Sequence, residues 1–148
     1  MLFQVTDSGL TYAQLTYWKN SATLYGHAIN VTQNNWIALT NYGSVLNKQG
    51  KSAEALAYFQ EALRIKPDEV IYNDMGNAYW HLNFLDKAVG AYKEAIRLKP
   101  DFKEAHNNLG FLYLDMGKKQ LAINEYNFLL TIDPALADQL RRDIQQSP

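Results

Sequence analysis

The sequence predicts an all-α fold: a right-handed superhelix (α-solenoid) of stacked antiparallel helical hairpins that ends in a capping helix. Two sets of residues recur at spacings of 33 and 34 residues, and a fixed period of this length is the signature of a repeat architecture. They are the glycines Gly43, Gly76 and Gly110 and the prolines Pro67, Pro100 and Pro134. No alternating run of β-branched residues, which would indicate strands, stands between them.

Further residue classes keep their register between these glycines and prolines. Counting from each glycine, a large apolar residue follows at three, an alanine at twelve, an aromatic residue at sixteen and another apolar residue at nineteen. In order these are Leu46, Tyr79 and Tyr113; Ala55, Ala88 and Ala122; Phe59, Tyr92 and Tyr126; and Ala62, Ala95 and Leu129. Glycine and alanine let two helix backbones approach closely, and the aromatic ring then fills the gap beside them.

Each complete copy predicts two helices joined by a tight turn. In the second copy one helical face carries Tyr72, Met75, Tyr79 and Leu82. A turn is expected at Asn83, matched by Gly50 and Gly117, because Gly and Asn tolerate the left-handed conformation that ends helices. Residues 86–98 then form a second amphipathic helix, which Pro100 stops.

The two ends of the chain are predicted to be incomplete or polar-backed versions of this unit. Trp18 and Tyr25 stand at repeat positions of an earlier copy, so we expect a helix over 19–31 preceded by a truncated or frayed one. After Pro134, a stripe of Leu136, Leu140 and Ile144 predicts a capping helix with one apolar side. The predicted organisation is a single domain over 1–148, with a degenerate copy at 2–35, copy one at 36–68, copy two at 69–102, copy three at 103–136 and the capping helix at 135–146.

The three complete copies resemble the tetratricopeptide repeat, whose motif sets the residue type at positions 4, 7, 8, 11, 20, 24, 27 and 32. Copy one supplies Leu39, Tyr42, Gly43, Leu46, Ala55, Phe59, Ala62 and Pro67; copy two Tyr72, Met75, Gly76, Tyr79, Ala88, Tyr92, Ala95 and Pro100; copy three His106, Leu109, Gly110, Tyr113, Ala122, Tyr126, Leu129 and Pro134. The departures, His106 at position 4 and Leu129 at position 27, lie in the last copy, where atypical packing is expected.

A second resemblance concerns the segment YWKNSATLYGHAINVTQNNW. It is similar to the segment that opens the repeat tail of bacterial multi-spanning membrane proteins related to glycosyltransferases. This resemblance implies that the chain is the soluble tail of a larger bacterial protein. It also implies an extracytoplasmic location, whereas a free protein would be cytoplasmic.

Composition excludes several classes of partner and chemistry. A net charge of −1 removes the strongly basic face that nucleic-acid binding needs. The absence of cysteine rules out disulfides, a thiol nucleophile and a Cys-type zinc site. No apolar run approaches the roughly 18–20 residues of a membrane span, so we expect no membrane insertion of this segment.

No catalytic arrangement is recognisable, so we expect no enzyme activity, cofactor or metal. His27, His81 and His106 lie at unrelated repeat positions without a second ligand three or four residues away. His106 stands at a core-type position, which predicts a packed histidine. Acidic residues at helix starts, such as Asp68 and Asp133, are interpreted as helix caps.

The resemblance implies that a concave groove is lined by positions 2, 5, 9, 12 and 13 of each first helix. These are Ile37, Thr40, Ser44, Asn47 and Lys48; Val70, Asn73, Asn77, Trp80 and His81; and Glu104, Asn107, Phe111, Leu114 and Asp115. The predicted peptide-binding residues among them are Thr40, Ser44, Asn47, Asn73, Asn77, Trp80, His81, Asn107, Phe111 and Leu114. Asparagine carries a donor and an acceptor together, so such a row, backed by Asn41 and Asn108 at position 6, can bracket an extended peptide backbone.

Two alternatives stay open for the apolar groove residues. Large exposed aromatic residues mark binding anchors, which favours binding at Trp80. Phe111 and Leu114 fit either a binding surface or a core covered by the cap. Capture of a C-terminal carboxylate is not expected, because Thr40 replaces the lysine that the family's clamp uses.

Three functions are compatible with the sequence. The leading hypothesis is a non-catalytic scaffold that binds a peptide segment of a partner protein in the groove. A second is an accessory tail that presents substrate to a membrane-bound glycosyltransferase-like enzyme. A third is a self-associating module, with a homodimer formed through the N-terminal hairpin that contains Trp18.

Overall fold

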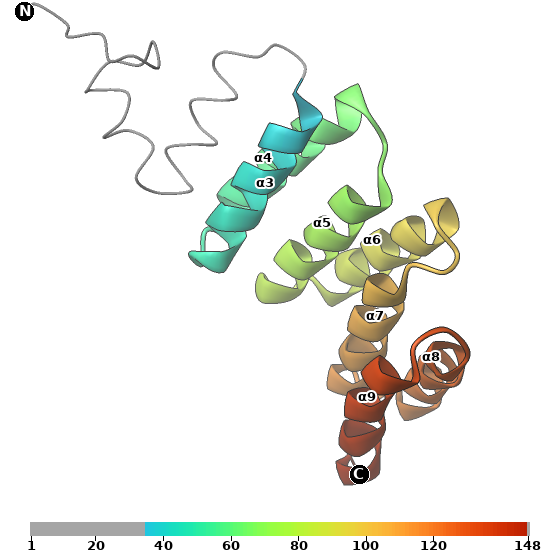
Figure 1. Ribbon diagram of the computed structural model, residues 1–148. Helices are drawn as coiled ribbons and strands as arrows, with labels where there is room; N and C mark the ends of the chain where they lie inside the picture. Colours follow the sequence, from blue (N-terminus) through green and yellow to red (C-terminus); the bar gives the residue numbers. More distant parts are fainter. Residues whose placement is uncertain (1–34, 148) are drawn as a thin grey trace, which may run out of the picture. The chain divides into compact units, whose positions relative to one another are not determined.

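The computed structural model describes residues 35–147, which contain seven α-helices and no strand (Figure 1). The helices are α3 (Trp36–Lys48), α4 (Ser52–Ile65), α5 (Glu69–His81), α6 (Leu85–Leu98), α7 (Lys103–Asp115), α8 (Lys119–Ile132) and α9 (Pro134–Gln146). This confirms the predicted all-α helical repeat. The degenerate copy predicted at 2–35, with its helix over 19–31, lies outside the described residues apart from Asn35. Within the described range, no helix combines the length and hydrophobicity that crossing a membrane requires.

Three helical hairpins share one turn geometry. Their connecting turns, residues 49–51, 82–84 and 116–118, have equal length. The middle residue of each turn has a positive φ: 79° at Gly50, 61° at Asn83 and 69° at Gly117. This left-handed conformation suits Gly and Asn, so the structure confirms the predicted turns.

The helices fall into two units, α3 with α4 and α5 to α9. In the first unit, Phe59 of α4 is fully buried against Gly43 of α3. A Cβ at Gly43 would stand 2.6 Å from the Phe59 ring, so only glycine leaves room for it. The rings of Tyr42 and Tyr58 meet edge to face, 4.7 Å apart, and extend the same contact.

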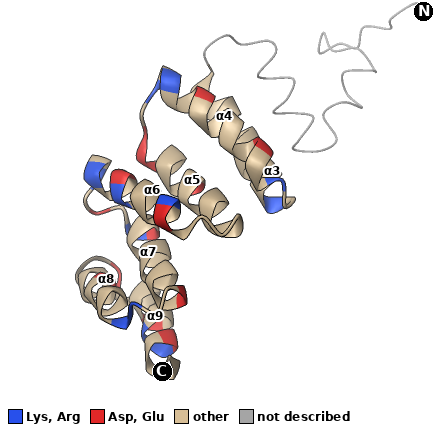
Figure 2. Cartoon of the chain, turned by 180° about the vertical axis from the view of Figure 1, so that it is seen from behind, with Lys and Arg blue, Asp and Glu red and all other residues tan. Residues whose placement is uncertain are grey.

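The second unit repeats this contact between α5 and α6. Tyr92 is fully buried, and a Cβ at Gly76 would stand 2.5 Å from its ring. Charges of both signs lie along α6, with Arg97 donating to Glu94 over 2.9 Å (Figure 2). Such exposed pairs contribute little to stability.

The third hairpin, formed by α7 and α8, lacks this glycine–aromatic contact because the capping helix α9 packs against it. A Cβ at Gly110 would stand 2.5 Å from Leu140 of α9, whereas the aromatic residue of this copy, Tyr126, is only half-buried. Leu140 is fully buried, and α9 packs against both α7 and α8. The capping helix therefore fills the space over α7 that an aromatic ring fills in the two earlier hairpins.

Acidic residues begin two of the helices in the second unit. Asp68 accepts a hydrogen bond from the Val70 amide at the start of α5, and Asp133 accepts one from the Leu136 amide at the start of α9. Lys103 of α7 also donates to Asp133 over 2.8 Å. This hydrogen bond is the main reason that the pKa of Asp133 is lowered and that of Lys103 is raised.

Candidate functional site

Seven of the ten predicted groove residues lie in the second unit, on α5 and α7, which pack side by side. Four of them belong to α5, namely Asn73, Asn77, Trp80 and His81. The other three of these seven belong to α7, namely Asn107, Phe111 and Leu114. This side of the two helices is the α5–α7 face. Asn73 is buried within it, with 7% of its surface exposed, whereas the other six residues are half-buried or exposed. The other three predicted residues belong to α3, in the first unit.

Asparagine side chains connect the two helices of the α5–α7 face. The Asn108 amide donates to the side-chain oxygens of Asn73, over 3.0 Å, and of Asn77, over 3.3 Å. The Tyr92 hydroxyl of α6 donates to the same oxygen of Asn77 over 2.7 Å. The row of amides that the sequence predicts as a peptide bracket is therefore partly used inside the protein, where it holds α5, α6 and α7 together.

Burial keeps the Tyr92 hydroxyl of this network in its protonated form. Burial is the main cause that raises the pKa of Tyr92, and the charge of Asp74 raises it further. The Tyr92 hydroxyl consequently keeps its proton and remains a donor to Asn77. The sequence carries one signal for this contact, since copy one has Phe59, without a hydroxyl, at the same repeat position.

Trp80 makes a second connection across the α5–α7 face. Its indole N–H donates to a carboxylate oxygen of Asp115 at the end of α7, over 2.9 Å. The ring is half-buried and packs against the main buried cluster of the second unit. Trp80 thus presents part of its ring at the surface, in an orientation that Asp115 fixes.

Phe111 and Leu114 of α7 are neither fully buried nor fully exposed. Both are half-buried and both contact the same buried cluster as Trp80. Each therefore belongs to the packing of the third hairpin on one side and keeps accessible surface on the other.

Two further residues of the α5–α7 face differ in their surroundings. Asn107 is half-buried, and its side-chain oxygen is buried without a hydrogen-bond partner in the described part of the chain. His81 is exposed at the end of α5. A buried acceptor without a partner is costly, but this oxygen is inaccessible, so it can receive a donor from a ligand only if the Asn107 side chain turns outward.

The three predicted residues of α3 are engaged within their own hairpin. The Thr40 hydroxyl donates to the Trp36 carbonyl over 2.7 Å, and the Ser44 hydroxyl donates to the Thr40 carbonyl over 3.0 Å. Asn47 accepts a 2.6 Å hydrogen bond from Ser52 of α4. Thr40 and Asn47 are buried, with 5% and 8% of their surface exposed.

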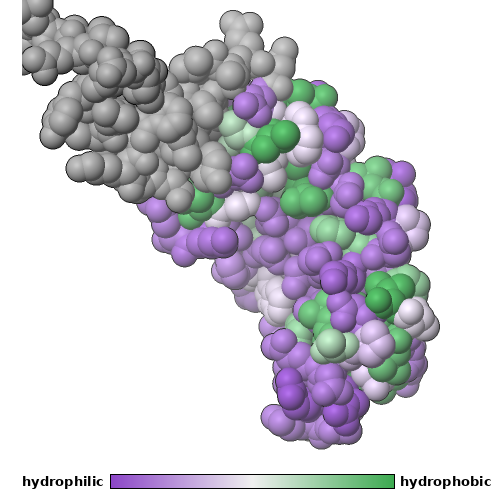
Figure 3. Space-filling view, in the orientation of Figure 1, coloured by the Kyte–Doolittle hydropathy of each residue, from purple (hydrophilic) through white to green (hydrophobic). Residues whose placement is uncertain are grey.

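Sequence reasoning missed a set of exposed apolar residues on α8. Leu121, Phe128, Leu130 and Ile132 are each 37–41% exposed, and Figure 3 shows hydrophobic side chains at the surface over this helix. The signal is visible in the repeat register. Positions 19 and 26, which carry Glu54 and Glu61 in copy one, carry Leu121 and Phe128 here.

No group of three or more potential metal ligands is found among residues 35–147. His106 is 7% exposed, in agreement with its core-type repeat position. The α5–α7 face carries amide groups beside the partly exposed rings of Trp80 and Phe111.

Family models agree with the repeat register. Models described as tetratricopeptide repeat match residues 8–70 and 103–136, and one described as TPR repeat matches residues 76–117. Together these matches cover most of the chain. The chain belongs to the tetratricopeptide-repeat family. This confirms the resemblance seen in the sequence.

Curated proteins with similar repeats are much longer than this tetratricopeptide-repeat chain. It is 32% identical over 114 residues to the human protein O-mannosyl-transferase TMTC2, which covers 74% of this chain and 13% of that protein. It is 28% identical over 116 residues to the bovine BBSome complex member BBS4, which covers 78% of this chain and 22% of that protein. The chain thus spans less than a quarter of the length of these relatives.

Solved structures share the tetratricopeptide-repeat fold. The first repeat domain of Spaghetti (RPAP3), bound to an HSP90 peptide, matches with a TM-score of 0.70 and 24% identity, covering 80% of this chain and 96% of that chain. The second domain of human RPAP3, in complex with an HSP70 peptide, matches with a TM-score of 0.67 and 19% identity, covering 74% and 93%. MamA matches with a TM-score of 0.70 and 18% identity, covering 99% and 94%.

Proposed function

We propose that this chain is a non-catalytic interaction module that holds a peptide segment of a partner protein on the α5–α7 face. The observation that carries the proposal is the arrangement of this face. Its two helices are fixed by the hydrogen bonds of Asn108 and Trp80, while the Asn107 side-chain oxygen has no hydrogen-bond partner among residues 35–147. A rigid surface that offers amide groups beside aromatic rings suits an extended peptide, because little ordering is left to oppose binding.

The comparisons support this proposal at the level of the family. Both RPAP3 domains are described with bound peptides, of sequence SRMEEVD and SGPTIEEVD. Those peptides are acidic, whereas the α5–α7 face of this chain carries Glu104 and Asp115, both exposed. We therefore propose that the partner segment here is not an acidic C-terminal peptide held through its carboxylate.

Aromatic anchors should dominate the affinity. Truncating an aromatic anchor at an interface commonly costs about 2 kcal/mol or more, which corresponds to a loss of more than tenfold in Kd. We expect Trp80→Ala to weaken binding to that extent, and Asn107→Ala to weaken it less. The matched control is Phe84→Ala, because Phe84 is an aromatic residue that is 51% exposed in the α5–α6 turn, off the proposed face.

The experiment selects peptides on the wild-type chain from a random displayed library and measures their affinities for each variant by calorimetry. Circular dichroism verifies that each variant keeps its helices. Weaker binding by Trp80→Ala with unchanged binding by Phe84→Ala supports the proposal. Equal binding by both variants, with helices intact, removes the α5–α7 face as the peptide site.

A second candidate function is favoured by the match to protein O-mannosyl-transferases. We propose as the alternative that this chain is the accessory repeat segment of a larger membrane-bound glycosyltransferase-like protein, where it presents substrate to a separate catalytic domain. The gene upstream of Met1 distinguishes the two. Encoded membrane spans in the same reading frame support the accessory segment, and a promoter immediately upstream contradicts it.

Self-association through the N-terminal hairpin stays a prediction, because Trp18 and its neighbours lie outside the described residues. Light scattering over a range of protein concentrations tests it. A molecular mass that stays at the monomer value of 16.9 kDa would exclude it.

A further inference from the structure

A titratable side chain occupies a packing position in the third hairpin. His106 of α7 stands at the repeat position that carries Leu39 in copy one and Tyr72 in copy two. Only 7% of its surface is exposed. An apolar residue would satisfy this position by packing alone, so the partners of the imidazole ring require an explanation.

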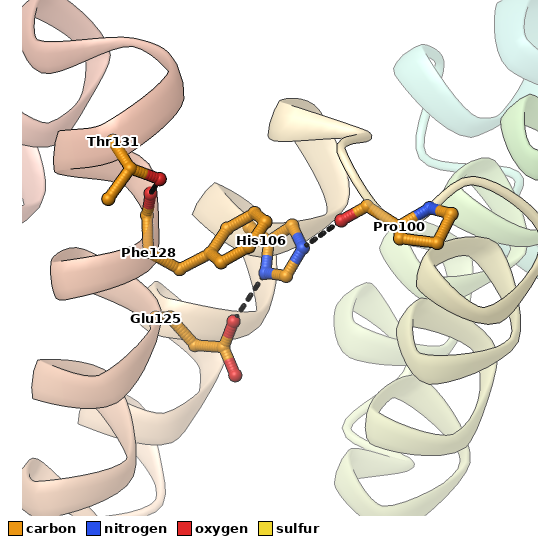
Figure 4. Close-up of polar contacts among 5 residues, drawn as sticks. All are labelled: Pro100, His106, Glu125, Phe128 and Thr131. Atoms are coloured by element: carbon orange, nitrogen blue, oxygen red, sulfur yellow. Dashed lines mark hydrogen bonds and ion pairs between the residues drawn. The ribbon is translucent and has the colours of Figure 1, made fainter.

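Both ring nitrogens of His106 face hydrogen-bond acceptors (Figure 4). Nδ1 lies 2.6 Å from a carboxylate oxygen of Glu125 on α8. Nε2 lies 2.9 Å from the carbonyl oxygen of Pro100, in the turn between α6 and α7. A neutral imidazole has one N–H and can donate to one of these groups, whereas the imidazolium donates to both.

An aromatic ring also packs on the face of the His106 imidazole. Phe128 of α8 stacks on His106 with ring centroids 4.1 Å apart and an angle of 26° between the planes. A positively charged ring is attracted to the face of an aromatic ring, so this contact favours the same protonated form.

The charged surroundings of His106 agree with this geometry. Burial is the largest single influence on its pKa and lowers it, but the hydrogen bonds to Glu125 and to the Pro100 carbonyl, with the charge of Glu125, outweigh burial and raise the pKa. Among the described residues, Glu125 is the charged side chain whose field acts on the ring. Lys103, one turn earlier on α7, is paired with Asp133, and Lys99 and Asp101 of the adjoining turn are exposed.

We propose that His106 is a pH-sensitive connection that links α7 to its neighbouring elements. As an imidazolium it holds α7 both to α8 and to the turn that links α6 to α7, and when it loses its proton one of these two connections is released. The proposal does not rest on the proposed peptide site, because it concerns the attachment of the third hairpin and its test measures stability.

The direction of the effect follows from linkage. An unfolded histidine titrates near pH 6.5, and the pKa of His106 is raised in the folded chain. The stabilisation is therefore complete below about pH 6.5 and is lost as the pH rises through the folded-state pKa.

The experiment is urea unfolding of the full chain at a series of pH values from 6 to 9. In the wild type, the equilibrium constant for unfolding should increase with pH over this range. His106→Leu, which installs the residue of copy one, should abolish the increase that this histidine causes, and Glu125→Gln should reduce it. The matched control is His81→Gln, since His81 is exposed and should leave the increase intact.

A second measurement reads the same group directly. The ring-proton resonance that disappears in His106→Leu identifies His106 in NMR spectra of the wild type, and its titration midpoint should move down in Glu125→Gln. An unchanged pH dependence of unfolding in a folded His106→Leu variant would overturn the proposal. So would an unchanged titration midpoint in Glu125→Gln.

Discussion

At the scale of single residues, three glycines share a repeat position, and in each case a neighbouring side chain occupies the space that a Cβ would need. The neighbours are Phe59 at Gly43, Tyr92 at Gly76 and Leu140 at Gly110. The first two pairs were predictable, because glycine and aromatic residue recur at a fixed spacing within one copy. The third was not, because Leu140 belongs to the capping helix, and a repeat register does not define which capping side chain enters the position.

Gly76→Ala tests the close approach of α5 and α6. The new methyl group would stand 2.5 Å from the buried Tyr92 ring, so we expect a loss of about 1–3 kcal/mol in the free energy of unfolding. Gly90→Ala on α6 is the matched control, because a Cβ there meets nothing within 4 Å. Since alanine favours helices over glycine, this variant should gain about 0.5–1 kcal/mol. Urea unfolding measures the free energy of unfolding of both variants. Equal changes in the two variants would contradict the close approach of α5 and α6 at Gly76.

For the amides of the α5–α7 face, the sequence predicts the helix that carries each residue but not its hydrogen-bond partner. The repeat position correctly puts Asn73 and Asn77 on the first helix of copy two, beside α7. It does not reveal that Asn108 donates to both, since a carboxamide can turn toward a neighbouring helix or toward a ligand from the same position. The hydrogen bond from Trp80 to Asp115 was hidden for the same reason.

At the scale of elements, the helices and turns were largely predictable from the sequence. Helical periodicity with Pro and Gly boundaries predicted a helix over 86–98, and α6 covers Leu85–Leu98. The capping helix was expected over 135–146 and is found as Pro134–Gln146. These elements were accessible because their signals are local, whereas the packing of α9 against α7 depends on residues about 30 positions apart.

Leu140→Ala tests whether α9 is a structural part of the third hairpin. Leu140 is fully buried against Gly110, and truncating a buried leucine commonly costs about 2–5 kcal/mol. We expect a lower urea midpoint for this variant. Gln139→Ala, at an exposed neighbour on the same helix, should leave the free energy of unfolding within about 0.5 kcal/mol of the wild-type value. Equal midpoints for the two variants would show that the capping helix adds no stability.

At the scale of the whole molecule, the sequence predicts function less well than fold. The tetratricopeptide register appears in the residues themselves and in the family models. A partner leaves no comparable periodic signal, because binding depends on which few side chains of a shared scaffold are accessible and unpaired. Of the ten predicted groove residues, Thr40, Asn47 and Asn73 are buried, whereas Trp80 and Phe111 keep accessible ring surface.

The most direct test of the central claim is a chemical-shift map of the chain with a library-selected peptide. The account predicts that the largest shifts fall on the Trp80 indole N–H and the side-chain amide of Asn107, with smaller shifts along α5 and α7. Resonances of α6 and α8 that lie away from this face should change little. Largest shifts on the exposed apolar residues of α8, with the Trp80 and Asn107 signals unchanged, would contradict the account.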